Sequence, residues 1–431
     1  MLALKPLIKL MTSAIITRRI VSFFCVLGGF IMLISISLIL LVGMFSGWIC
    51  KKLRLPSLLG MILTGIVLGP HILNLIDISI LNISADLRKI ALIIILTRAG
   101  LTLDINDLKK VGRPAILMCF VPAAFEIVGM IILAPKLFDI SILEAAIIGT
   151  VVGAVSPAVI VPKMIRLIDE GYGTNKSIPQ LILAGASVDD VFVIVLFSAF
   201  TGLAQGKQIS VMSFANIPIS ICLGIAVGIL SGFLLSKFFD KAHIRDTAKV
   251  IITLGISFVL VTIEDNLTSS ITFSALIAIM FIGIAMQKHR KGTAERLSVK
   301  FNKLWVGAEI FLFVLVGTAV DIHYVTSAAI PAVILIFGVL CFRMIGVFLC
   351  LLHTNLSLKE RLFCMLAYMP KATVQAAIGG IPLSMGLACG EIVLTIAVMA
   401  ILITAPLGAF LIEITHKKLL KQELKEDYVN G

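Results

Sequence analysis

The feature that most constrains this fold is a series of apolar runs, each about twenty residues long, from one end of the chain to the other. As a helix, such a run is long enough to cross the roughly 30 Å hydrocarbon core of a bilayer. Backbone polar groups in lipid must be satisfied within the segment, and the runs lack the two-residue alternation of membrane barrel strands. The sequence therefore predicts an all-α polytopic membrane protein, in agreement with 59% hydrophobic and only 14% charged residues.

The runs predict thirteen spans. They lie near residues 28–50, 56–69, 87–103, 113–133, 142–162, 179–203, 213–235, 248–264, 270–286, 304–320, 327–352, 361–382 and 392–414. Lys and Arg gather on alternate connections, beginning with Lys51–Arg54, and in the C-terminal tail. The opposite side carries only Arg88, Lys89, Lys136 and Lys207. By the positive-inside rule, the net charge of +12 sets orientation, with the C-terminus cytoplasmic, and no nucleic acid partner is expected.

The N-terminal segment, residues 1–27, does not fit this count. It carries Lys5, Lys9, Arg18 and Arg19, which would lie outside the cell ahead of the first span. Two interpretations stay open: an interfacial basic helix, or an additional short crossing that returns these charges to the inside.

Two adjacent acids lie within one apolar span. Asp189 and Asp190 occur in ILAGASVDDVFVIVLFSAF, and each carboxylate at mid-membrane costs roughly 2.5–3.5 kcal/mol on insertion scales. Such a cost is accepted where charges meet an ion, a proton path or a counter-charge. The pair predicts a cation and proton site in which each ligand expels the other. A purely structural pair neutralised by basic residues is the alternative.

Two spans are interrupted by helix breakers. The fifth reads IIGTVVGAVSPAVIVPKM and the twelfth AYMPKATVQAAIGGIPLSMG, and proline removes a backbone donor and breaks a helix. If the seventh span is a linker, these are the fifth spans of two halves, which indicates inverted repeats around a midplane site. Two unrelated proline kinks are the alternative. The positions expected to break these helices or lend oxygens to a cation are Thr150, Ser156, Pro157, Pro370 and Thr373.

Three further charges are predicted to lie deep in the membrane. Glu126 and Arg343 form a matched pair, for which a structural salt bridge is favoured over an ion ligand. Lys371 follows Pro370 at the break, where it is expected to neutralise Asp189 when no cation is bound; snorkelling towards the interface is the alternative.

No catalytic site, cofactor or resident metal is expected. The cysteines have no CxxC spacing and the histidines lie in loops or at span ends. An intramembrane aspartyl protease would need aspartates on two helices, and no GxGD run is present.

Several motifs together resemble one transporter family. RAGLTLD, GAVSPAVIVPKM, GYG at 171–173, GASVDDV and PKATVQAAIGGIPL are similar in order and spacing to the NHA-type sodium/proton antiporters. These form the B branch of solute carrier family nine, with bacterial relatives, in the monovalent cation:proton antiporter superfamily.

The resemblance implies a fold and a domain division. We expect an NhaA-like antiporter fold of two inverted repeats with two discontinuous crossing helices, within residues 28–414. The expected divisions are a dimer subdomain (about 28–103 and 248–320), a core subdomain (about 113–203 and 327–414), a linker helix (about 213–235) and a cytoplasmic tail (415–431).

The resemblance also implies roles and a function. Asp189 and Asp190 would bind Na⁺ or protons, Glu126 and Arg343 would bridge helices, and Lys371 would be a base near the aspartates. The expected protein is a homodimeric antiporter of a plasma (inner) membrane that exchanges Na⁺ or Li⁺ for H⁺ by alternating access. A K⁺/H⁺ efflux antiporter or K⁺ pathway of the same fold is the alternative, and electrogenic and electroneutral exchange both stay open.

Overall fold

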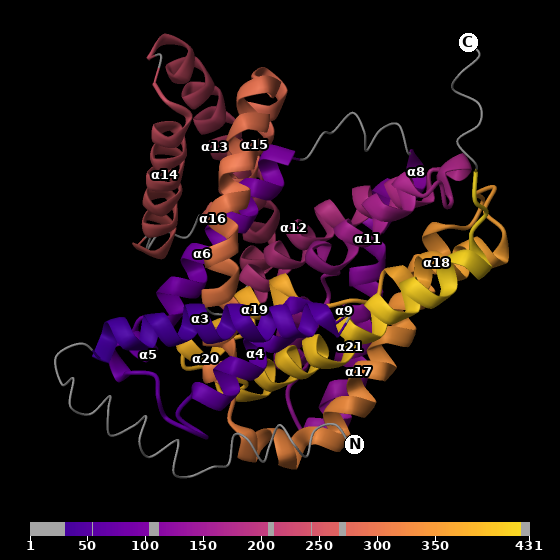
Figure 1. Ribbon diagram of the computed structural model, residues 1–431, viewed down its shortest axis with the longest axis horizontal. Coiled ribbons are helices and arrows are strands. Elements are labelled where there is room, and N and C mark those ends of the chain that lie inside the picture. Colours follow the sequence, from indigo (N-terminus) through magenta and orange to yellow (C-terminus); the bar gives the residue numbers. More distant parts are fainter. Residues whose placement is uncertain are drawn as a thin grey trace.

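The computed structural model describes residues 31–53, 55–102, 112–205, 211–242, 244–266 and 273–423, and the regular structure in these ranges is helical (Figure 1). The N-terminal segment 1–27 and the last eight residues lie outside the described residues, so both placements of that segment stay open. The one β-interaction in the described ranges is an isolated bridge between Tyr172 and Gln422.

Seven described helical segments are long and apolar enough to cross a membrane. They are Met32–Lys52, Arg113–Phe138, Ile142–Asp169, Cys222–Lys241, Asp246–Asn266, Ala328–Cys350 and Gly390–Leu419. Three shorter apolar helices are Ser57–Leu68, Phe192–Ala204 and Ala275–His289. Each of the thirteen predicted spans overlaps a single helix or a series of two or three interrupted helices, while the number of crossings itself stays a prediction.

The contacts divide the helices into two groups. The first, the scaffold group, packs around α16 and α15. It consists of α3 (Ile31–Lys52), α4 (Ser57–Leu68), α5 (Ile78–Asn82), α6 (Ser84–Thr102), α13 (Val211–Lys241), α14 (Asp246–Asn266), α15 (Ala275–His289) and α16 (Lys291–Thr318). The helix expected to be a linker, α13, packs closely along α15.

The second group, the crossing group, holds the interrupted helices. It consists of α8 (Arg113–Met118), α9 (Val121–Phe138), α10 (Ile142–Val152), α11 (Pro157–Asp169), η1 (Thr174–Lys176), α12 (Ile178–Ala204), α17 (Ile322–Cys350), α18 (Leu358–Ala367), α19 (Thr373–Ile378), α20 (Ile381–Ser384) and α21 (Gly390–Leu419). The short helix α19 lies inside the bundle, where it contacts α10 and α21 of its own group and α6 and α16 of the scaffold (Figure 1).

Glycines bring scaffold helices into backbone contact. A Cβ on Gly65 of α4 would lie 1.9 Å from the Val314 carbonyl oxygen of α16, and one on Gly317 would lie 2.2 Å from the Ile62 oxygen. Association of helices in lipid depends on this close packing of small residues, because the bilayer supplies no hydrophobic drive between apolar faces. The crossing of α4 and α16 is therefore fixed by shape.

The GYG motif forms a clasp with the C-terminal segment. Gly171 and Gly173 have φ of +76° and +69°, a region that suits glycine. The Gly173 amide donates to the Lys421 carbonyl (2.8 Å) and the Glu423 amide donates to the Gly171 carbonyl (2.9 Å). Together with the Tyr172–Gln422 bridge, these bonds tie the end of α21 to the loop that precedes α12.

Gly171→Ala should weaken this clasp. A Cβ there would lie 2.3 Å from the Glu423 carbonyl oxygen, on a backbone with positive φ, and the left-handed conformation alone costs about 1–2 kcal/mol. We expect a lower unfolding temperature in detergent and faster proteolysis after residue 419. Gly255→Ala in α14, where a Cβ meets nothing within 4 Å, is the control; equal behaviour of the two variants would contradict the clasp.

Candidate ion-binding site

Two interrupted helices meet at their breaks. Helix α10 ends at Val152 and α11 begins at Pro157, while α18 ends at Ala367 and α19 begins at Thr373. The Ser156 amide donates to the Pro370 carbonyl over 2.8 Å, which joins the two breaks directly. Pro157 and Pro370 lie at the two breaks. Because proline has no N–H, neither residue can donate a backbone hydrogen bond there. The structure thus has both predicted interruptions, and they lie together.

The carbonyls released by the first break are bound by side chains. Gln375 of α19 donates from Nε2 to the carbonyls of Val152 (3.2 Å) and Ala154 (2.9 Å). The carbonyl between these two, that of Gly153, accepts from Arg343. Buried backbone acceptors in lipid must find such partners. Gln375 therefore links α19 to the α10 break, a role that its position in an apolar run did not indicate.

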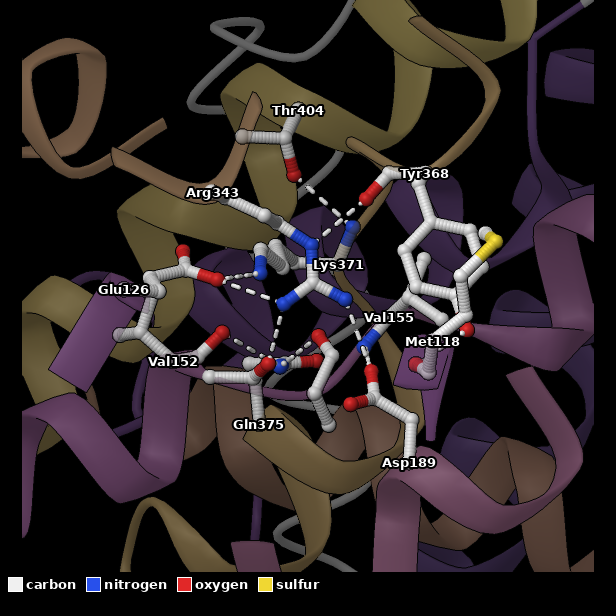
Figure 2. A network of polar contacts seen from close by, with 12 residues as sticks. Met118, Glu126, Val152, Val155, Asp189, Arg343, Tyr368, Lys371, Gln375 and Thr404 are labelled. Carbon is white, nitrogen blue, oxygen red and sulfur yellow. Dashed lines mark hydrogen bonds and ion pairs between the residues drawn. The ribbon is translucent and has the colours of Figure 1, made fainter. Parts of the chain in front are cut away.

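A buried charge network lies against this crossing (Figure 2). From α17, Arg343 donates from Nη1 to Glu126 of α9 and from Nη2 to Asp189 of α12, each over 2.7 Å. Its Nε donates to the Tyr368 carbonyl (2.7 Å). Each of the charged side chains is at most 1% exposed. One guanidinium therefore joins α9, α12, α17 and the second break.

The predicted pairing of Glu126 with Arg343 is present, but Lys371 has another partner than expected. Its ammonium donates to Glu126 over 2.6 Å, whereas the carboxylate of Asp189 is bound by Arg343. The planar, forked guanidinium can reach two carboxylates at once, while an ammonium is a point charge. Arg343 thus serves both acids, and Lys371 binds the shared Glu126 oxygen.

Several acidic and polar oxygens around the crossing are buried without a hydrogen-bond partner. Oδ2 of Asp189 accepts from Val155 N–H (2.8 Å) and from Arg343, but its Oδ1 is unpartnered. The Asp190 Oδ1 is also buried and unpartnered, and no ion pair of Asp190 occurs among the described residues. The other such oxygens here are Glu126 Oε1, Ser156 Oγ and Gln375 Oε1. Such hard oxygens suit a proton or a hard cation.

The remaining predicted positions line the breaks. Thr150 and Thr373 are both buried, in the last turn of α10 and at the start of α19, and the Thr150 hydroxyl donates to the Ile147 carbonyl of its own helix (2.7 Å). Thr404 of α21, which the sequence did not indicate, accepts from the Lys371 amide (2.9 Å). In the part of the chain that the structure describes, no group of three or more His, Cys, Asp or Glu side chains could hold a resident metal.

A membrane chain whose interrupted helices meet around buried carboxylates has the architecture of a secondary ion transporter. A family model described as "Sodium/hydrogen exchanger, transmembrane" matches residues 36–418. The chain belongs to this sodium/hydrogen exchanger family, so it is a transporter and not an enzyme, and the resemblance to NHA-type antiporters is confirmed.

Individual relatives agree. Human sodium/hydrogen exchanger 9B2 is 32% identical over 394 residues, which cover 88% of this chain and 72% of the relative. Human sodium/hydrogen exchanger 9B1 is 31% identical over 382 residues, covering 85% and 73%. The sodium proton antiporter MjNhaP1 from Methanocaldococcus jannaschii superposes with a TM-score of 0.79 at 21% identity, over 90% of this chain and 99% of that one. That likeness concerns the fold, and the family relation supports cation/proton antiport.

Glu126 lies between two cations, which makes its charge important for stability. Glu126→Gln should lower stability by about 3–5 kcal/mol, because Arg343 and Lys371 would lose their shared counter-charge. Arg343 would still be paired with Asp189, so one positive charge would be in excess. Adding Lys371→Gln removes that charge and should restore part of the loss. A thermal unfolding series in detergent checks this double-mutant cycle. Strictly additive losses would contradict the shared role of Glu126.

Proposed function

We propose that the protein exchanges Na⁺ or Li⁺ for H⁺, with the cation and protons competing for Asp189 and Asp190. The observation that carries the proposal is the pair of unpartnered carboxylate oxygens of these two residues beside the crossing. Both relatives named above carry "Sodium/hydrogen exchanger" in their names.

The charges of the network favour a single exchangeable ligand. Three carboxylates (Glu126, Asp189 and Asp190) lie near two bases (Arg343 and Lys371), which leaves one negative charge to balance. Glu126 and Asp189 already accept charge-assisted hydrogen bonds. Asp190 therefore carries the charge that a proton or a cation neutralises. When the cation binds, the negative charge that held the proton is neutralised and the proton leaves. Protonation releases the cation in the same way, and this replacement is the exchange step.

Asp189 has a supporting role in the same step. Adjacent residues on a helix point about 100° apart, so the two carboxylates approach one cation only from different sides of α12. Asp189 offers its free Oδ1 while Arg343 and Val155 hold Oδ2. The oxygens of Ser156 and Gln375 at the breaks are candidates to complete the shell, whereas Glu126 and Lys371 keep the bridge in place.

The division of the helices into two groups supports alternating access. We infer that the crossing group, with the site, moves as a unit against the scaffold group, which forms the homodimer. In this proposal the crossing group is the core subdomain expected from the sequence, and the scaffold group apart from the expected linker helix α13 is the dimer subdomain. The inverted repeats expected for halves of this kind would make the inward and outward arrangements alike. The Lys- and Arg-rich side, with the C-terminus, would face the cytoplasm of a plasma membrane.

Removal of one carboxyl charge tests the site. Proteoliposomes with an internal pH dye should respond to Na⁺ and Li⁺, with no response in Asp190→Asn and at least a tenfold slower one in Asp189→Asn. Asp240→Asn, at an exposed pair with Arg290, is the matched control and should match the wild type. Full activity of Asp190→Asn would refute the site, and a response to K⁺ alone would replace the proposed substrate.

Competition gives a second test. Suppose that protons and Na⁺ share Asp190. At pH values below that at which the site is half-protonated, each further drop of one pH unit then raises the Na⁺ concentration for half-maximal exchange about tenfold. The maximal rate should stay nearly constant, because saturating Na⁺ displaces the protons. Initial rates measured over a grid of pH and Na⁺ check this. A maximal rate that falls with pH while half-saturation stays fixed would contradict competition.

A further inference from the structure

Tyr368 lies between the charge network and the helices α8 and α12. It is fully buried and directly follows α18, at the start of the second break. Figure 2 shows its ring beside Arg343 and its hydroxyl end towards Met118.

Tyr368 holds the guanidinium of Arg343 by two separate contacts. Its backbone carbonyl accepts from Nε over 2.7 Å, and its ring centroid lies 5.1 Å from Cζ. A guanidinium over an aromatic ring gains cation–π attraction, and more where water is excluded. The remaining nitrogens of Arg343 serve Glu126, Gly153 and Asp189. The position of the ring thus constrains the group that binds Asp189.

The far end of the ring is anchored as well. The Tyr368 hydroxyl donates to the Met118 carbonyl at the end of α8 over 3.1 Å. It lies against Gly185 of α12, one helical turn before Asp189, where a Cβ would be 2.5 Å from the hydroxyl oxygen. The ring is therefore held between α8 and α12. The absence of a side chain at Gly185 leaves the room that the hydroxyl needs.

We propose that Tyr368 is a positioning residue for exchange: it sets the place of the Arg343 guanidinium against Asp189, and through it the pH range and apparent cation affinity of transport. This inference rests on the proposed function. A displaced guanidinium balances Asp189 less well, so the acid pair holds its protons more tightly and the cation competes less effectively.

Substitution of the ring separates this role from packing. In the proteoliposome assay, Tyr368→Leu should raise the Na⁺ concentration for half-maximal exchange about tenfold at fixed pH. The pH of half-maximal activity should rise by about 1, with the maximal rate at high pH and saturating Na⁺ within about twofold of wild type. Tyr368→Phe keeps the ring and should recover most of the affinity. Tyr172→Leu, in the clasp, is the matched control and should move neither quantity.

A second pair of variants moves the ring without removing it. Gly185→Ala should push the Tyr368 hydroxyl away and raise the pH of half-maximal activity, as Tyr368→Leu does. Tyr368→Phe removes the hydroxyl oxygen that would lie 2.5 Å from the new Cβ. The rise in the pH of half-maximal activity should therefore be smaller when the two substitutions are combined. A shift smaller in the double variant than in Gly185→Ala alone is a result that general destabilisation does not produce.

The outcomes are distinguishable. If wild-type protein exchanges no cation for protons, the proposed function fails. If the wild type exchanges normally and Tyr368→Leu lowers only the maximal rate or the amount of folded protein, with pH range and half-saturation unchanged, Tyr368 is a packing residue and the inference is overturned.

Discussion

The structure of the site depends on one guanidinium held inside the membrane bundle. Arg343 donates to two carboxylates and two backbone carbonyls that belong to four different segments. A buried charge is tolerated only when it is paired and its hydrogen bonds are made. Because Arg343 can be satisfied only where α9, the α10 break, α12 and the α18 break come together, it fixes their relative positions. The two interrupted helices can then expose backbone at membrane depth.

The distribution of partners supports the proposal that Asp190 is the acid at which a cation and protons exchange. Glu126 is bound by Arg343 and Lys371, and Asp189 by Arg343 and a backbone amide. Asp190 has an unpartnered buried oxygen and no ion pair among the described residues. The same network that stabilises the crossing thus leaves the Asp190 carboxylate without an ion pair among the described residues, which favours it as the proposed site of exchange. In this account stability and transport share residues but use different oxygens.

Most of the charged residues of the site and both helix breaks could be predicted from the sequence. Charges are rare in apolar spans because their burial in lipid is costly, so those that occur stand out. The charges that stand out within apolar runs are those of Asp189, Asp190, Glu126 and Arg343. The prolines indicate both breaks. The partner of Lys371 was not predictable, because three acids and two bases at similar depth allow several pairings, and geometry alone chooses among them. Gln375, Tyr368 and Thr404 gave no signal, since neutral polar side chains are common in membrane helices. The GYG motif was visible, but the segment it binds lies about 250 residues away and no local pattern links the two.

If a cation and protons occupy one acidic site by turns, cation binding must release protons. Titration calorimetry of the detergent-solubilised protein with Na⁺ or Li⁺, in two buffers of different ionisation enthalpy, counts the protons released per cation bound. We expect measurable release for the wild type near the pH of half-maximal exchange, and neither release nor binding for Asp190→Asn. Cation binding of undiminished affinity in Asp189→Asn/Asp190→Asn, or binding by the wild type with no proton released at any pH, would contradict it.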